Sequence, residues 1–251
     1  MDGVASLLFF AGALLLLGAL GSWVVRQPVF GLRGVILEGD VQRQSAAAVH
    51  ARVVNQLSGN FFTLDLGQSR TVFEGLPWVR QAVVRRSFPN ALEVQLQEHQ
   101  AAAYWGGADQ STMVNSYGEV FEASRDDVEG ESLLQLSGPD GSSAEVLRMS
   151  KLLAPQLQQG LQQSLRALQL SVHGDWKAIM TSGAQIDIGR GTDAQIQSRV
   201  QRFVSSYAQA GTKYGRTRSE HIETADLRYA DGYAIKWVGV TTGDGHQPAR
   251  R

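Results

Sequence analysis

An uncharged apolar stretch near the N-terminus limits most strongly what this chain can fold into. It runs from Val4 to Val25 and reads VASLLFFAGALLLLGALGSWVV. A helix of about 20 apolar residues spans the hydrocarbon core of a bilayer, and it satisfies its own backbone hydrogen bonds there. Trp23 suits the membrane interface, and Arg26 marks the exit to water. We therefore predict a transmembrane anchor over residues 1–26 and a large extramembrane part after it.

Two other interpretations of this stretch are a cleaved signal peptide and a buried core helix. The small residues around Leu20 suit cleavage, but Met1-Asp2 brings no Lys or Arg, and the run exceeds the usual apolar region of about 7–15 residues. A core helix of this length would have a polar face, whereas this stretch is apolar all round. The pattern favours a retained anchor.

The charges beside the anchor predict an orientation. Arg26 and Arg33 follow it, while only Asp2 and the α-amino group precede it. By the positive-inside rule, these charges alone place the C-terminal part in the cytoplasm.

Composition excludes several classes of function. The chain has 23 Lys and Arg against 24 Asp and Glu, so its near-neutral charge gives no electrostatic footprint for nucleic acid. It contains no cysteine, which excludes disulfides, thiolate chemistry and cysteine-based zinc sites.

The segment over residues 27–100 predicts a small α+β domain. Its patterns indicate the order β-α-α-β-β, with both helices packed on one face of the sheet. Leu92, Val94 and Leu96 alternate with polar residues, which is typical of a half-buried strand. Ser45 is the candidate cap of the first helix. The expected strands are 31–37, 78–86 and 91–98, and the expected helices are 46–57 and 69–75.

Residues 101–242 predict a mixed, β-rich domain with two helices. A hairpin is expected over 113–121 with its turn at 115–118. We expect a capping box of Ser142 and Glu145 to begin the first helix, and Thr192 or Asp193 to begin the second. The helices are expected over 143–158 and 193–208, and the other strands over 133–136, 165–172, 176–180, 184–188, 220–228 and 233–238. The tail 243–251 is expected to be disordered.

Two groups of motifs carry a family resemblance. The first domain contains GLPWVRQAVVRR at 75–86 and FPNAL at 88–92. The second contains the 113–121 hairpin, Trp176, a strand at 186–188 followed by Gly189-Arg190, and DLRY at 226–229 with Gly232, Ala234 and Trp237 after it. In this order they resemble the bacterial cell-division protein FtsQ (DivIB) family, whose first domain is a POTRA domain. The resemblance covers about residues 4–240.

The resemblance implies a bitopic scaffold of the division machinery, the divisome. It implies that the N-terminus is cytoplasmic, that both domains lie in the periplasm, and that the protein sits in the inner membrane at the division septum. This orientation opposes the one that charge predicts, and we follow the resemblance because large domains cross membranes largely regardless of charge. The chain departs from the family in having almost no cytoplasmic stretch before the anchor. Either the true start lies upstream, or translocation proceeds despite the weak charge signal.

The resemblance also implies partners and a site. In this family the last strands bind FtsB, which pairs with FtsL and leads to septal peptidoglycan synthesis. By position, the implied binding residues are Arg228, Tyr229, Asp231, Gly232 and Trp237. Family members often have a small polar residue where Asp231 stands.

Physical reasoning points to the same strands. A terminal strand exposes unpaired N–H and C=O groups that can accept a partner strand. Tyr229, Tyr233 and Trp237 would add large contact area. The alternative is that Tyr233 and Trp237 simply close the core.

We find no sequence pattern for catalysis, and predict no enzymatic activity, cofactor, metal or small-molecule substrate. The five histidines lack metal-ligand spacing, and there is no GxSxG motif. A membrane-anchored periplasmic hydrolase stays an alternative, and a pocket that holds His173 or His221 beside a Ser or Asp would favour it. A POTRA-containing secretion or assembly component would need a long β-barrel, for which too little chain remains. The basic run Arg80, Arg85 and Arg86 is expected either to contact another division protein or to form a solvated strand end.

Overall fold

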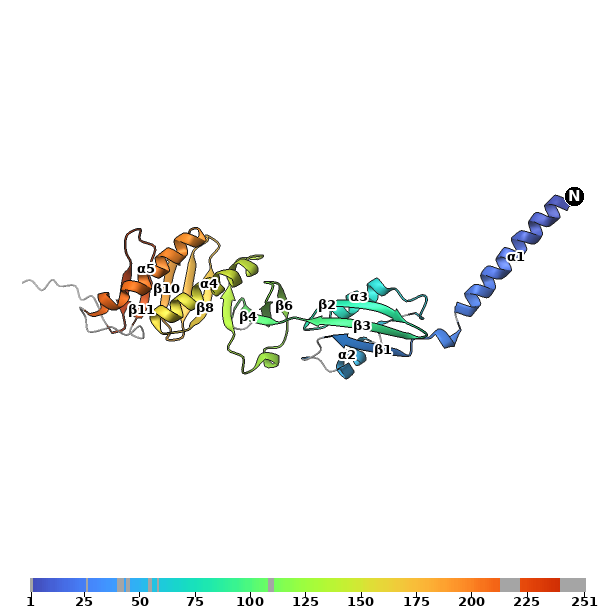
Figure 1. The fold of residues 1–251 in the computed structure, drawn as a ribbon, viewed down its shortest axis with the longest axis horizontal. Helices are drawn as coiled ribbons and strands as arrows, with labels where there is room; N and C mark the ends of the chain where they lie inside the picture. Colours follow the sequence, from blue (N-terminus) through green and yellow to red (C-terminus); the bar gives the residue numbers. More distant parts are fainter. Residues whose placement is uncertain are drawn as a thin grey trace, which may run out of the picture. The chain divides into compact units, whose positions relative to one another are not determined.

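A computed structural model describes residues 2–25, 27–39, 43, 46–53, 56–57, 59–107, 111–212 and 222–239 of the 251-residue chain. Arg26, the predicted cap Ser45, His221 and the predicted tail 243–251 lie outside the described residues. The chain divides into two compact units, residues 1–99 and 100–251, which are described separately (Figure 1).

The N-terminal apolar stretch forms one continuous helix, α1 (Asp2–Val25). Its segment Ser6–Trp23 is uncharged, and none of it is buried against the rest of the chain. Large side chains such as Phe9 and Leu15 are 78% and 76% exposed. At 1.5 Å per residue, α1 is about 36 Å long, which is enough to cross the hydrocarbon core of a bilayer.

The rest of the first unit is a three-stranded sheet with two helices, and the predicted β-α-α-β-β order is confirmed. The strand order is β1-β3-β2; β1 pairs with β3 in parallel, and β2 pairs with β3 antiparallel. A short 3-10 turn, η1 (Pro28–Phe30), precedes the sheet. The elements are β1 (Gly34–Gly39), α2 (Ala46–Val53), α3 (Leu66–Glu74), β2 (Val79–Ser87) and β3 (Ala91–Glu98).

The core of this unit follows the predicted periodicities. Leu92, Val94 and Leu96 of β3 are buried, as their alternation predicts. They pack with Val49 from α2 and Phe73 from α3.

Helix α3 begins three residues earlier than predicted, because an unpredicted N-cap precedes it. The Asp65 Oδ1 atom accepts hydrogen bonds from the backbone N–H groups of Gly67 (2.7 Å) and Gln68 (3.2 Å). This aspartate satisfies two of the donors that the first turn leaves unpaired.

The second unit is a mixed sheet of nine strands with two long helices over one face (Figure 1). The sheet order is β12-β11-β10-β9-β8-β7-β4-β5-β6. The strands are β4 (Ala101–Trp105), β5 (Thr112–Asn115), β6 (Val120–Glu122), β7 (Leu134–Ser137), β8 (Leu165–Leu170), β9 (Trp176–Met180), β10 (Gln185–Gly189), β11 (Ile222–Asp226) and β12 (Ala234–Trp237). The helices are α4 (Ser143–Leu161), α5 (Asp193–Thr212) and the 3-10 helix η3 (Arg125–Val128).

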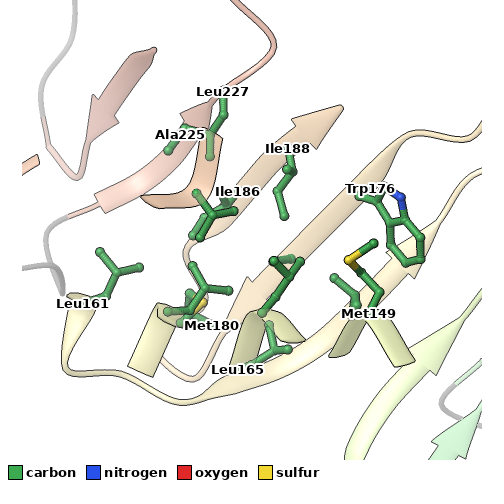
Figure 2. Packing of buried hydrophobic residues seen from close by; sticks show 14 of the residues in the cluster. Met149, Leu161, Leu165, Trp176, Met180, Ile186, Ile188, Ala225 and Leu227 are labelled. Carbon is green, nitrogen blue, oxygen red and sulfur yellow. The ribbon is translucent and has the colours of Figure 1, made fainter. Parts of the chain in front are cut away.

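One hydrophobic cluster fills the space between these helices and the sheet (Figure 2). Met149 and Leu161 of α4 meet Trp176, Met180 and Ile186 of the sheet, all at most 3% exposed. The inward faces predicted for both helices are confirmed. The buried positions are Val146, Met149, Leu153 and Leu157 in α4, and Ile196, Val200, Phe203 and Tyr207 in α5.

The predicted capping box at the start of α4 is wrong. Ser142 makes no side-chain cap, and its hydroxyl donates to the carbonyl of Pro139 at 2.6 Å. Such a box begins α5 instead: Thr192 Oγ1 accepts from Gln195 N (3.4 Å), and Gln195 Oε1 accepts from Thr192 N (3.0 Å). Helix α4 also continues through Pro155 to Leu161, three residues beyond the predicted end.

Candidate functional site

Strand β12 forms one margin of the nine-stranded sheet. It pairs antiparallel with β11, from Ile222 opposite Trp237 to Asp226 opposite Ala234. No strand among the described residues pairs with its other side. That side can therefore accept a further strand.

The loop between β11 and β12, residues 227–233, is held by contacts with distant elements. Leu227 is buried, and its backbone N–H donates to the carbonyl of Asp187 on β10 at 2.8 Å. Arg202 of α5 donates through Nη1 to the carbonyl of Ala230 at 2.7 Å. Figure 2 shows Leu227 beside Ala225 of β11. The loop thus has a fixed conformation although most of its side chains face water.

Tyr233 joins this loop to α5. Its hydroxyl lies 2.8 Å from Ser206 Oγ. Its ring meets the Phe203 ring edge-on, with 5.2 Å between the centroids. Tyr233 therefore packs against the core, as the alternative interpretation predicted.

The structure separates the five predicted site residues into two groups. Arg228, Tyr229 and Asp231 are exposed, with Tyr229 at 57%, and Gly232 beside them is half-buried. Trp237 is only 7% exposed and belongs to the hydrophobic core. The loop residues can reach a partner with their side chains, whereas the Trp237 ring holds β12 against the sheet.

Arg228 is oriented by an aspartate that sequence reasoning did not assign to the site. It donates through Nε to Asp226 Oδ1 (2.9 Å) and through Nη2 to Asp226 Oδ2 (2.7 Å). This side-chain pair holds the pKa of the Asp226 carboxyl below its usual range and raises the pKa of Arg228. The spacing Asp-x-Arg at the end of a strand was the signal available in the sequence.

Gly189 makes room for this arginine. Its φ of +79° favours glycine, and a Cβ atom there would lie 2.8 Å from Arg228 Cγ. The Gly189-Arg190 step of the family pattern therefore has a packing role beside the candidate site.

A hollow of about 500 Å³ adjoins Arg228, and it holds the residues that would favour a hydrolase. Ser171, His173 and Asp175 all line it. However, the Ser171 Oγ atom accepts hydrogen bonds from the backbone N–H groups of His173 (3.2 Å) and Asp175 (3.0 Å). Within the described part of the chain, no hydrogen bond joins the His173 ring to either neighbour. A serine nucleophile needs a base to accept its proton, and here Ser171 forms a turn instead.

The described residues also contain no group of three or more His, Asp or Glu side chains suited to a metal ion. Of the basic run on β2, Arg86 has a structural role. It donates to the carbonyls of Phe61 and Leu64, both at 2.7 Å. Arg85 is exposed, and Arg80 lies 3.3 Å from Gln97 Oε1.

Comparisons with known proteins agree with this architecture. Residues 103–228 match the family model described as cell division protein FtsQ/DivIB, C-terminal. Residues 30–99 match the model described as POTRA domain, FtsQ-type. The C-terminal match ends at Arg228, so β12 lies beyond it.

Full-length relatives extend the similarity through β12. The chain is 41% identical to cell division protein FtsQ of Thiomonas arsenitoxydans over 244 residues, covering 96% of this chain and 87% of that protein. It is 36% identical to FtsQ of Burkholderia pseudomallei, covering 94% of this chain and 92% of the relative. It is 33% identical to FtsQ of Bordetella pertussis, covering 89% and 85%. With its apolar N-terminal helix, its POTRA domain and its β-rich C-terminal region, the chain belongs to the FtsQ/DivIB family of bacterial cell-division proteins.

Proposed function

We propose that this protein is a bitopic scaffold of the divisome that binds FtsB and FtsL through its β-rich unit. In this proposal residues 1–26 anchor it in the inner membrane with the N-terminus in the cytoplasm. The POTRA domain (27–100) and the β domain (101–242) lie in the periplasm at the septum, and 243–251 form a tail. Bound FtsB and FtsL link the scaffold to septal cell-wall synthesis. Family membership and the apolar helix α1 support the coarser role in cell division.

The open side of β12 is the observation that carries this proposal. A partner segment that adds to this margin gains main-chain hydrogen bonds along four residues, Ala234–Trp237. Main-chain pairing alone does not select a sequence. Selection requires side chains next to the edge, and the loop 227–233 supplies them.

Tyr229 and Arg228 suit that selection for different reasons. Tyrosine offers a large, rigid surface and a hydroxyl at little cost in conformational entropy. Arg228 is already oriented by Asp226, so little further ordering is needed when an acidic partner group approaches. Both residues lie on a loop that α5 and β10 hold in place.

Trp237 contributes in another way. Because its ring is buried, its replacement would weaken partner binding by displacing β12 rather than by removing a contact. We also propose that the protein has no catalytic activity, since the Ser171 hydroxyl beside His173 is engaged in a turn.

The test is Tyr229→Glu with Tyr117→Glu as the matched control. The two tyrosines are 57% and 62% exposed, and they lie in hairpins at opposite margins of the same sheet. A central hot-spot residue contributes about 2 kcal/mol or more, so Tyr229→Glu should weaken FtsB binding by about 30-fold or more. Tyr117→Glu should leave binding unchanged.

Binding of the full chain in detergent to the FtsB–FtsL pair, measured by biolayer interferometry, gives both values. Circular dichroism shows that each variant is folded. Full binding by a folded Tyr229→Glu variant would refute the site.

A further inference from the structure

Four phenylalanines gather in the first unit, in segments that are far apart in sequence. They are Phe30, Phe61, Phe62 and Phe88, here called the phenylalanine cluster. Ring centroids lie 4.9 Å apart for Phe30 and Phe62, 5.2 Å for Phe61 and Phe62, and 6.1 Å for Phe61 and Phe88. Each pair meets edge-on, the arrangement that aromatic quadrupoles favour.

Backbone hydrogen bonds hold these segments together. The N–H of Phe61 donates to the carbonyl of Phe30, and the N–H of Arg33 donates to the carbonyl of Asn90, both at 2.9 Å. The Arg86 guanidinium fixes the carbonyl of Phe61 from β2. The cluster is therefore a built feature of the domain and not a chance contact of loose side chains.

The cluster is only partly buried. Phe61 is 7% exposed, but Phe62 is 47% exposed, Phe88 is 77% exposed, and Val29 next to Phe30 is 61% exposed. Asn60 keeps Phe62 on the outside, because its Oδ1 atom accepts from the backbone N–H groups of Phe62 (3.0 Å) and Thr63 (2.9 Å). A single exposed apolar residue is ordinary, whereas linked exposed rings mark an interaction site.

The chain itself places this cluster close to the end of α1. Only five residue steps separate Val25, the last residue of α1, from Phe30. Fully extended, they reach about 18 Å, and the 3-10 turn η1 shortens that reach. This limit comes from covalent geometry, so it holds however the domain is turned relative to α1.

The chemistry of the cluster fits a lipid surface. Aromatic and apolar side chains enter the layer between headgroups and acyl chains, and arginine pairs with lipid phosphates. The exposed Arg33 follows Phe30 in the same segment and supplies such a cation. A protein partner would also bury rings, but the short tether to a membrane-spanning helix favours lipid.

We propose that the phenylalanine cluster docks the POTRA domain onto the surface of the membrane that α1 crosses. Phe62 and Phe88 enter the headgroup layer, and Arg33 contacts phosphate. This inference rests on the proposed function in one respect, the insertion of α1 into the bilayer. Docking would fix the orientation in which the first domain leaves the membrane.

The absence of cysteine in the chain makes a site-specific test direct. Phe88→Cys and Gln81→Cys are each labelled with a nitroxide in the full chain. The labelled proteins are reconstituted in nanodiscs of phosphatidylcholine and phosphatidylglycerol. Gln81 is exposed on the same strand, six residues before Ser87, which is about 20 Å along β2.

Collision of the label with oxygen, which concentrates in lipid, is compared with collision with a water-soluble nickel chelate. At position 88 oxygen should dominate, and at position 81 the chelate should dominate. Adding Phe62→Ser to the Phe88→Cys protein should shift position 88 toward the chelate. These discs contain only lipid and the chain, so a protein-binding cluster would leave position 88 in water.

The outcomes separate this inference from the proposed function. If the chain stays in the disc and positions 88 and 81 both favour the chelate, the docking inference is overturned and the anchor stands. Equal preference for oxygen at both positions also overturns it, because the contact would then not be specific to the cluster. If the full chain does not remain with the disc at all, the membrane anchor itself fails.

Discussion

The two hairpins at the margins of the nine-stranded sheet look alike in sequence but differ in how they are held. Hairpin β5–β6 ends one margin, and hairpin β11–β12 ends the other. Each presents a tyrosine that is more than half exposed, Tyr117 and Tyr229. Exposure of the tyrosine alone therefore does not identify a binding site.

The β5–β6 turn is fixed by residues within and next to itself. The buried Asn115 side chain accepts from the N–H groups of Tyr117 and Glu119, both at 2.9 Å, through Oδ1. Gly118 packs against the start of α4, where the Ser143 hydroxyl donates to its carbonyl at 2.6 Å. This turn is closed and serves the fold.

The β11–β12 loop is fixed from a distance, by α5 and β10. Arg202, Ser206 and Asp187 hold its backbone and Tyr233, which leaves Arg228 and Tyr229 facing water beside an open strand. The comparison shows that a recognition loop needs order supplied by elements behind it. Its outer side chains then stay available.

The largest effect is expected from Trp237→Ala. Replacing a buried Trp by Ala should lower the free energy of unfolding by about 3–5 kcal/mol, because it leaves a cavity where β12 meets the core. Amide hydrogen exchange of β11 and β12 measures the loss. Unchanged protection of both strands would show that this margin is not held by the ring.

Gly118→Ala should destabilise the opposite margin by about 2–4 kcal/mol, from a strained backbone and a close contact. Its φ is +87°, and the added Cβ would lie 2.6 Å from Ala144 Cα. Gly130→Ala is the control, since its φ is +93° but nothing lies within 4 Å. Thermal unfolding compares the two, and equal losses would contradict the close packing of the turn on α4.

Tyr233→Phe removes one hydroxyl and keeps the ring contact with Phe203. The lost hydrogen bond to Ser206 should cost about 1 kcal/mol. If the loop must be held from behind, FtsB binding should weaken although Tyr229 is untouched. Unchanged binding, with the loss of stability confirmed by urea unfolding, would show that this contact does not prepare the loop.

The smallest effect concerns the Asp226–Arg228 pair and its dependence on pH. Because the folded-state pKa of Asp226 is lowered, the pair stabilises the protein above the ordinary aspartate pKa of about 3.9. That stability is lost as pH falls through the lower folded value. Asp226→Asn should therefore reduce stability slightly at pH 7 and make no difference at the acid end, measured by urea unfolding at both pH values. A constant difference across the range would rule out this source.

Much of the fold could be predicted because it follows from local periodicity. The faces of α4 and α5 and the alternation of β3 were confirmed, since each depends only on which positions return to the same side. Helix starts were predicted less well. Ser142 and Thr192 are both plausible caps, and the fold around each residue decides whether its hydroxyl turns toward the helix or, like Ser142, toward Pro139.

The candidate site shows the same limit. The resemblance brought Tyr229 and Trp237 forward together, and pattern counting left open which of them faces outward. Nothing local reports that Asp226 orients Arg228, or that Gly189 makes room for it, because β10 and the end of β11 meet only through sheet pairing.

The sequence by itself determined the apolar helix, the two-part organisation and the family, because these depend on composition and on residues close together in order. Only the tertiary structure decided which aromatic side chains are buried. The reason is physical: burial depends on neighbours contributed by segments far along the chain. Trp237 lies in a core shared with α5, whereas Tyr229, a few residues earlier, meets water.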